Sequence, residues 1–444
     1  MTTARFADRI DDALPEVLLH LEAMVRIPSV SALPEHAEDV ARSARYAAEL
    51  LAELGLESRV VYAGGLPSVI AHRTAPPGAP TVLLYAHHDV QPAGDPAGWA
   101  SAPFEPDRRG GRLFGRGAAD DKAGLAVHLA ALLAHGDDLP VGVTVLVDGE
   151  EEIGSPTLPE LLSRYRDELA ADVIVVADSV NWAVGTPSLT VALRGLVDVV
   201  VELRTLEHAL HSGAWGGPVP DALTALVATL ASLHDADGTV AVEGLARGAG
   251  SRVEYDDTRF RADAGLLEGV RLAGRGSITD RLWLQPCLTV TAIDAPRVDG
   301  SANMLSAAAR AKVSMRVAPG EDPEVALKLL TEHLLAHAPH GAHIEVTPGA
   351  LAHPVLLAPP AAVRDLALGA LRDAWDGAEP VEIGVGGTLP LIRLFTDTFP
   401  RAAVLVTGVE DPDTRAHGTD ESLHLADFRN ACLAEALLLD RLGR

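Results

Sequence analysis

Cysteine is scarce in this sequence of 444 residues, which contains only Cys287 and Cys432. Two thiols can form at most one bridge, so the chain lacks the disulfide framework that stabilises many small secreted domains. We interpret both residues as buried, inert thiols. A reducing cytoplasm is therefore the simplest compartment for this protein.

Positive charge is also in short supply. Lys and Arg number 36 against 62 Asp and Glu, which gives a formal net charge of −26. Nucleic acids and anionic membranes repel such a chain at long range, so neither is an expected partner. No apolar run approaches the length that spans a bilayer. The first residues include acids rather than a basic, apolar leader, so they do not resemble a signal peptide: Asp8, Asp11, Asp12 and Glu16.

The apolar pattern of the first part predicts alternating helices and strands. Segments 5–25 and 38–54 carry apolar residues at helical spacing, and the second ends at Gly55. Short, β-branched runs at 81–86, 141–147 and 172–177 predict strands. We expect an α/β fold with a mostly parallel central sheet and helices on both faces.

The pattern changes after about residue 187. Antiparallel strands are predicted at 189–193, 197–203, 287–293 and 311–317, a helix at 221–233, and a loop or arm at 248–280. Candidate metal ligands, 26 to 33 residues apart up to Asp178, are then absent for 239 residues until His417. We therefore predict an α+β domain at 188–350, inserted between two parts of the catalytic domain, 1–187 and 351–444.

Residues that bind metals follow the predicted strands of the catalytic domain. They are His87, Glu152, Asp178 and His417, with the pair Asp120-Asp121 after a glycine-rich turn. In open α/β sheets, ligands gather outside the carboxyl ends of the strands. Imidazole nitrogen and carboxylate oxygen bind Zn²⁺, Mn²⁺ and Co²⁺ alike. The sequence therefore predicts a hydrolytic site for two divalent metal ions.

Two ions in such a site lie about 3.5 to 4 Å apart, which requires a bridging ligand. We expect Asp120 to form this bridge. One ion would then be bound by His87 and Asp178, and the other by Glu152 and His417.

Two assignments near these ligands have alternatives. Asp89 can accept the second ring N–H of His87 and fix its tautomer, although His88 could replace His87 as the ligand. Asp121 and Lys122 could be ligand-turn residues or could cap a helix and pair with neighbours. The remaining histidines of interest are expected to be structural or on the surface: His128, His135, His234, His333 and His337.

Three consecutive carboxylates, Glu150 to Glu152, cannot all bind one ion pair. At least one is left for proton transfer, and we assign this role to Glu151, with Glu150 as the alternative. Metal ions lower the pKa of bound water from about 15.7 to about 7, and a nearby carboxylate can carry its proton to the leaving amine. The predicted reaction is amide hydrolysis by a metal-bridging hydroxide, with Glu151 as general base.

Five motifs are shared with a known family. They are His87-His88-Asp89-Val90-Gln91-Pro92, the segment 115–122, Glu151-Glu152-Ile153-Gly154-Ser155, Leu210-His211-Ser212-Gly213 and Gly386-Gly387-Thr388-Leu389-Pro390. In these motifs and their order the chain resembles the dinuclear zinc metallopeptidases that include carnosinase, glutamate carboxypeptidase, succinyl-diaminopimelate desuccinylase and aminoacylase. The resemblance covers nearly the whole chain.

The resemblance implies the same five ligands and the same general base. It also implies a cis peptide between Asp120 and Asp121. The inserted domain at 188–350 would be a lid and dimerisation domain, through which two subunits form a homodimer. His211 would reach the active site of the partner subunit and stabilise the oxyanion. Arg316 would bind a substrate carboxylate, unless it is a salt-bridge partner at a strand end. Asn303 and Gly387 are further candidate substrate-binding residues.

Finer similarities indicate the substrate class. Gln91-Pro92, Trp99 and the segment 103–105 are most similar to the carnosinase-like branch, which favours dipeptides and short peptides. Gly384-Val385 stands where relatives often carry Arg-Glu, so recognition of the substrate ends stays open. A deacylase or carbamoylase of N-substituted amino acids is the alternative. A non-catalytic binding protein with a decayed site is disfavoured by the intact Glu151 and its five neighbouring ligands.

Overall fold

The β-branched segments form the central strands of a sheet in a computed structural model of the protein, which describes residues 2–387 and 389–444. The chain divides into two compact units. Unit 1 contains Met1–Val191, Leu357–Ile383 and Pro390–Arg444, and unit 2 contains Ala192–Leu356 and Gly384–Leu389. None of the helices in the described residues is both long and apolar enough to cross a membrane.

Unit 1 is built on a twisted sheet with a parallel centre. Its strands run in the order β1 (Glu57–Val61), β2 (Ser68–Arg73), β6 (Gly142–Asp148), β3 (Thr81–His87), β7 (Val173–Val176), β17 (Ala403–Val406) and β8 (Ser188–Leu193). The four strands from β6 to β17 are parallel, and antiparallel pairs flank them on both sides. The predicted α/β class is confirmed, with parallel pairing concentrated at the sheet centre.

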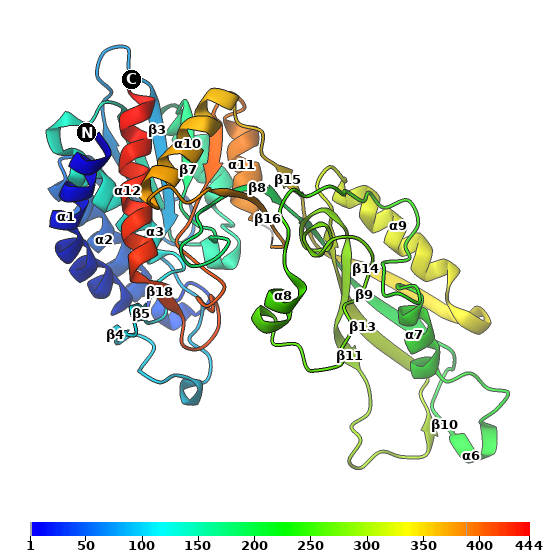
Figure 1. Ribbon diagram of the computed structural model, residues 1–444. Coiled ribbons are helices and arrows are strands. Elements are labelled where there is room, and N and C mark those ends of the chain that lie inside the picture. Colours follow the sequence, from blue (N-terminus) through cyan, green and yellow to red (C-terminus); the bar gives the residue numbers. More distant parts are fainter. Residues whose placement is uncertain (1, 388) are drawn as a thin grey trace. The chain divides into compact units, whose positions relative to one another are not determined.

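Helices cover both faces of this sheet (Figure 1). One face packs against α1 (Thr2–Val25), α2 (Ala37–Glu53), α3 (Lys122–His135), α10 (Ala361–Ala374) and α12 (Leu425–Leu442) in a single apolar core. The segment of α3 is almost free of charge, and nearly all of its residues are buried because α1, α12 and β3 surround it. On the other face, α11 (Pro390–Thr398) contacts β17 and α4 (Leu158–Arg164), which is followed by α5 (Arg166–Leu169).

Parallel register brings the candidate ligands to one edge of the sheet. Tyr85 in β3 is aligned with Leu146 in β6 and Val176 in β7. The residues that follow these positions therefore leave the sheet together. A small antiparallel sheet of β4 (Asp107–Arg109), β5 (Arg112–Phe114) and β18 (Ser422–His424) holds the segments beside the remaining ligands.

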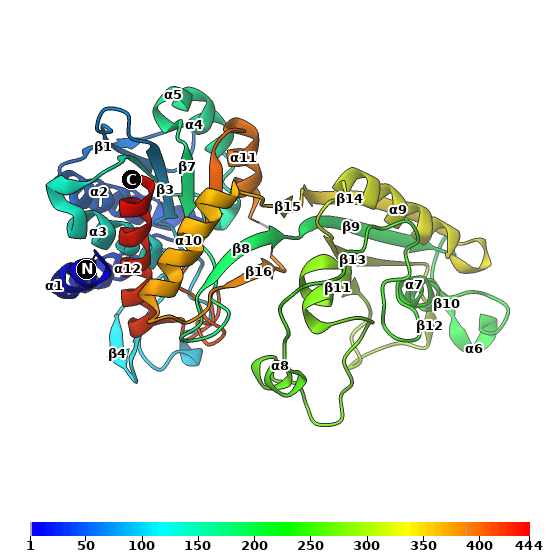
Figure 2. The same cartoon turned by 45° about the horizontal axis from the view of Figure 1, so that its top comes forward.

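Unit 2 is an antiparallel sheet with helices on one face (Figure 2). Its strands are ordered β11 (Cys287–Asp294), β13 (Ala308–Val317), β9 (Gly195–Arg204) and β14 (His343–Ala352). Buried and less buried residues alternate along β9 and β13, as expected for a sheet with one covered face. The buried residues pack against α7 (Ala222–Ala231) and α9 (Pro323–Ala336).

Shorter elements complete unit 2. They are β10 (Leu210–His211) paired with β12 (Met304–Leu305), α6 (Ser212–Trp215), α8 (Asp257–Asp263), and β15 (Val355–Leu356) paired with the end of β8. Strand β16 (Val381–Val385) also pairs with β8. Helix α8 lies in the segment expected to be a loop. It has seven residues and begins where the Asp256 carboxylate accepts from Arg259 N at 2.9 Å.

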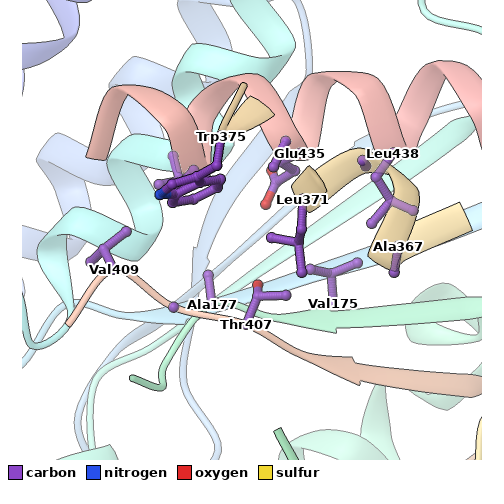
Figure 3. Close-up of a pocket in the computed structure, with 14 residues that line it drawn as sticks. Val175, Ala177, Ala367, Leu371, Trp375, Thr407, Val409, Glu435 and Leu438 are labelled. Atoms are coloured by element: carbon purple, nitrogen blue, oxygen red, sulfur yellow. The ribbon is translucent and has the colours of Figure 1, made fainter. Parts of the chain in front are cut away.

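A small cavity lies in unit 1 between the sheet, α10 and α12 (Figure 3). Its volume is about 30 Å³, and Val175, Leu371 and Trp375 are among its mostly apolar lining residues. Pockets that bind small molecules usually measure about 300 to 1,000 Å³. This cavity is therefore a packing feature and not a peptide-binding site.

A buried ion pair lies beside the cavity. The Nδ1 of His128 lies 2.8 Å from the Glu435 carboxylate, and its Nε2 lies 3.1 Å from the main-chain oxygen of Tyr85. Burial opposes a charged ring, but Glu435 and the Tyr85 carbonyl raise the pKa of His128 above its ordinary value. The structural role expected for His128 is confirmed.

This pair makes the stability of the protein depend on pH. The folded-state pKa of His128 is raised, so the ion pair contributes fully to the free energy of unfolding below about pH 6.5. This contribution is lost as the pH rises through the folded-state pKa. Relative to a His128→Leu/Glu435→Leu variant, the wild-type protein should lose up to about 1.4 kcal/mol per pH unit in that window. Urea unfolding of both proteins from pH 6 to 9 tests this, and parallel curves would contradict it.

Candidate metal centre

Two groups of side chains in unit 1 are arranged to hold metal ions. One consists of His87, Glu151 and Asp178, and the other of Asp120, Glu152 and His417. Within each group, the candidate ligand atoms all lie within 4.8 Å of one another. The structure thus brings all five predicted ligands and the predicted general base into two adjoining clusters.

These side chains are positioned by the ends of strands and helices and by the loops that follow them. His87 is the last residue of β3, and Asp178 follows β7 by two residues. Glu151 and Glu152 open a 3-10 turn (Glu151–Ile153) after β6. Asp120 precedes α3, and the peptide bond between Asp120 and Asp121 is cis, as the resemblance implies. His417 lies in the loop between β17 and β18, with a φ of 61°.

Asp120 connects the two clusters. Its Oδ1 lies 3.2 Å from His87 Nε2, and its Oδ2 lies 3.0 Å from His417 Nε2. The second imidazole also lies 3.2 Å from Glu152 Oε2. One carboxylate oxygen thus faces each histidine, which is the arrangement that a bridging ligand requires.

The chemistry of these groups fits divalent cations. Two buried atoms form no well-aligned hydrogen bond with any described residue: Asp178 Oδ2, and His87 Nε2 despite its 3.2 Å approach to Asp120 Oδ1. Buried polar atoms in this condition are uncommon. Hydrogen bonds to Asp120 and Glu152 raise the pKa of His417 to about 11. Burial raises the pKa of Asp178 to about 7, against the opposing effect of His87. A site with this excess of negative charge and these donors suits two ions such as Zn²⁺.

Asp89 supports both the histidine and the carboxylates. His87 Nδ1 lies 3.1 Å from the main-chain oxygen of Asp89 and 3.4 Å from its carboxylate Oδ1. The Asp89 carboxylate also accepts from Glu151 N at 3.2 Å and from Glu152 N at 3.1 Å. Asp89 therefore fixes the turn that carries Glu151 and Glu152 as well as the ring of His87, a second task that the sequence did not suggest.

The two alternative residues are engaged elsewhere. His88 Nε2 lies 2.9 Å from Pro67 O, and burial lowers the pKa of His88 to about 4. The Glu150 carboxylate accepts from Leu66 N at 2.7 Å and from Thr157 Oγ1 at 2.5 Å. Both side chains hold loops together, and neither belongs to the two ligand groups.

The residues after Asp120 have structural contacts. The Asp121 carboxylate accepts from Gly124 N and His87 N, each at 3.2 Å, and so caps α3. Lys122 Nζ donates to the carbonyls of Met24 at 2.9 Å and Ile27 at 2.7 Å. The alternative of helix capping and pairing is confirmed for this pair.

Glu421 is an important residue that lies outside the five shared motifs. Its buried carboxylate pairs with Arg116 Nη1 at 2.6 Å and accepts from the main-chain nitrogens of Gly117, Ala119 and Asp120 at 3.0 to 3.1 Å. It holds the turn that carries Asp120. Only its position four residues after His417 hinted at a role.

We expect Glu421→Ala to destabilise unit 1 by about 3 to 5 kcal/mol, because it leaves the Arg116 charge buried and unpaired. The double variant Glu421→Ala/Arg116→Leu removes that charge and should recover part of the loss. Calorimetric unfolding measures both effects. Equal melting temperatures for the wild-type protein and Glu421→Ala would refute the bracing role.

The other candidate residues belong to unit 2. His211 is exposed, and its Nδ1 accepts from Gly213 N at 3.0 Å at the start of α6. The main-chain oxygen of Asn303 accepts from Ser212 N at 3.0 Å. Arg316 lies in β13, between Leu196 of β9 and Cys287 of β11. Gly387 follows β16 in the short segment that returns to unit 2.

An α/β fold with paired groups of histidines and carboxylates at its strand ends is typical of a metal-dependent hydrolase. Residues 83–441 match the family model of Peptidase family M20/M25/M40, and the chain belongs to this family. The predicted resemblance is confirmed.

Sequence relatives support the same family. A cysteinylglycine-S-conjugate dipeptidase of Corynebacterium striatum is 35% identical over 445 residues, which cover 98% of this chain and 96% of the relative. The human Beta-Ala-His dipeptidase is 27% identical over 409 residues, which cover 85% of this chain and 80% of the relative.

Solved structures show the same fold. Human carnosine dipeptidase 1 has a TM-score of 0.83 at 25% identity, over 100% of this chain and 99% of that one. The di-peptidase Dug1p of Saccharomyces cerevisiae also has a TM-score of 0.83, at 23% identity, over 99% and 98% of the two chains.

Proposed function

We propose that this protein is a metal-dependent dipeptidase that hydrolyses the peptide bond of short peptides. The observation that carries the proposal is the pair of ligand groups joined by Asp120, with Glu151 among them. The dipeptidase names of the relatives from Corynebacterium striatum and human support the substrate class.

The proposed ligands are His87 and Asp178 for one ion and Glu152 and His417 for the other, with Asp120 between them. We propose Zn²⁺ as the native metal, while Mn²⁺ and Co²⁺ suit the same donors. When bound, such ions acidify water and polarise the carbonyl of the scissile bond.

Glu151 is the proposed general base. Burial and the charge of Asp178 raise its pKa well above the ordinary range, and a carboxylate with a raised pKa is a stronger proton acceptor. The Asp89 carboxylate holds its main-chain nitrogen, so the side chain starts from a fixed backbone. Glu151 would accept a proton from the attacking water and deliver it to the leaving amine.

Four residues of unit 2 have proposed roles in substrate binding. Arg316 would bind the substrate carboxylate, and Asn303 and Gly387 would contact the peptide. In a homodimer formed through the inserted domain, His211 would donate to the oxyanion in the active site of the partner subunit. A cytoplasmic location accords with the two free cysteines.

Replacing His211 by Ala should lower kcat by about 10²- to 10³-fold, as for other oxyanion donors. The side chain is exposed and accepts a hydrogen bond from Gly213 N in its own turn, so the fold should tolerate the change. Steady-state kinetics measure the effect, and equal sedimentation of variant and wild type excludes altered assembly. A kcat near the wild-type value would refute the role.

The substrate class is tested by amino acid release. Purified, Zn²⁺- or Mn²⁺-loaded protein is given separate pools of dipeptides, tripeptides and N-acetyl amino acids. Chelator-sensitive release from dipeptides supports the proposal. Release only from the acylated pool would instead show a deacylase, and no release from any pool would favour a non-catalytic protein.

A further inference from the structure

One carboxylate beside the candidate metal centre lies outside both ligand groups and has no partner in the described part of the chain. The buried acids that are neither candidate metal ligands nor the candidate base are engaged by main-chain or side-chain donors, as described above for Asp89, Asp121, Glu150 and Glu421, and for Asp148 by Ser155 Oγ at 2.6 Å. Among the described residues, none forms a hydrogen bond or ion pair with the Glu410 carboxylate. This residue is also outside both ligand groups.

The backbone holds Glu410 next to the centre. Its main-chain oxygen accepts from Asn181 N at 2.8 Å, and the residue forms a parallel bridge with Val180, two residues after Asp178. Glu410 therefore lies on the segment adjoining the one that carries Asp178, at the carboxyl ends of β7 and β17. Both segments belong to unit 1, so the position of Glu410 next to Asp178 is set within a single compact unit.

The surroundings of Glu410 are strongly negative. Burial, together with the charges of Asp120, Asp178 and Glu421, raises its pKa well above the ordinary value, while His417 acts weakly in the opposite direction. Glu410 is nevertheless only half-buried, and its carboxylate oxygens are not fully enclosed by the protein. Its carboxylate is thus accessible from solvent, and no cation of the described chain neutralises it.

A half-buried carboxylate next to other negative charges attracts a cation that can reach it from solvent. A dipeptide differs from an N-acyl amino acid by its free ammonium group, which is two bonds from the scissile carbonyl carbon in an α-aminoacyl residue. The peptide carbonyl must lie at the centre between Asp120 and Asp178 for hydrolysis, so the ammonium lies nearby. We propose that Glu410 binds the free amino terminus of the substrate and thereby selects peptides over acylated amino acids.

This inference rests on the proposed dipeptidase function, and two matched substrates test both. Alanyl-alanine and propionyl-alanine release the same product and differ only in the ammonium group. Wild-type protein should prefer alanyl-alanine. Glu410→Gln should lower kcat/KM for alanyl-alanine by about 10²-fold or more, mainly through KM, because a site built for an N–H donor discriminates strongly. Its kcat/KM for propionyl-alanine should stay near the wild-type value.

Two controls separate substrate binding from other roles. Glu379→Gln makes the same chemical change at an exposed ion pair with Arg372 and should leave both activities unchanged. Metal content should be equal in Glu410→Gln and wild type. Glu410→Asp should retain part of the preference for the ammonium group.

The outcomes distinguish the role of Glu410 in binding the amino terminus from the proposed dipeptidase function. If Glu410→Gln lowers both activities equally or loses metal, Glu410 acts on the metal centre and the inference is wrong. If the variant keeps full activity on alanyl-alanine, the inference fails while the dipeptidase function stands. If wild-type protein hydrolyses propionyl-alanine but not alanyl-alanine, both are wrong.

Discussion

Glu151→Gln is expected to lower kcat by about 10²- to 10⁴-fold, the usual contribution of a general base. Glutamine has nearly the same shape but cannot take a proton from water at neutral pH. The main-chain nitrogen of residue 151 keeps its hydrogen bond to Asp89, so the turn should persist. Metal content and melting temperature should therefore stay close to the wild-type values. Single-turnover hydrolysis of a dipeptide measures the loss.

Glu150→Gln is the matched control, one residue away. Its carboxylate accepts from Leu66 N and Thr157 rather than facing the centre. Glutamine keeps one side-chain oxygen as acceptor, but its NH₂ group cannot accept from the donors on the other side. The free energy of unfolding should therefore fall by about 1 to 3 kcal/mol, with little change in kcat. If Glu150→Gln instead abolished turnover while Glu151→Gln stayed active, the two assignments would be exchanged.

Removal of the metal ions is expected to abolish hydrolysis and to lower the melting temperature. The two groups contain four carboxylates, Asp120, Glu151, Glu152 and Asp178. Without cations these groups repel one another, and the pKa of Asp178 is raised to about 7 largely by burial. An ion present at about 1,000 times its dissociation constant stabilises the folded state by about 4 kcal/mol.

The measurement combines activity, calorimetry and metal analysis after treatment with a chelator. Added Zn²⁺, Mn²⁺ or Co²⁺ should restore both activity and melting temperature. Because protons compete with metals for the same ligands, the metal-dependent stabilisation should shrink at low pH. Full activity in protein shown to be free of metal would contradict a metal-dependent mechanism.

Much of the fold could be predicted from local patterns. The helices predicted at 5–25 and 38–54 correspond to Thr2–Val25 and Ala37–Glu53, and the first three predicted strands correspond to β3, β6 and β7. Each burial pattern follows from spacing along one element. The short helix Asp257–Asp263 was missed because seven residues show too little periodicity.

The grouping of the candidate ligands was also predictable, because residues at the carboxyl ends of adjacent parallel strands must meet. His87 and Asp178 illustrate this: one ends β3 and the other follows β7, its neighbour in the sheet. The shared motifs pointed to the same residues. Chemistry and order along the chain were sufficient for this step.

The sequence by itself determined the fold class, the family and the set of residues at the centre. Tertiary structure alone decided which neighbour of a pair faces that centre, as for His87 against His88 and Glu151 against Glu150. It alone revealed that Glu421 braces the Asp120 turn across about 300 positions of sequence and that Glu410 has no partner within residues 2–387 and 389–444. The reason is physical: spacing along a strand or helix specifies a face, whereas a side chain's partner depends on which distant segment folds against it.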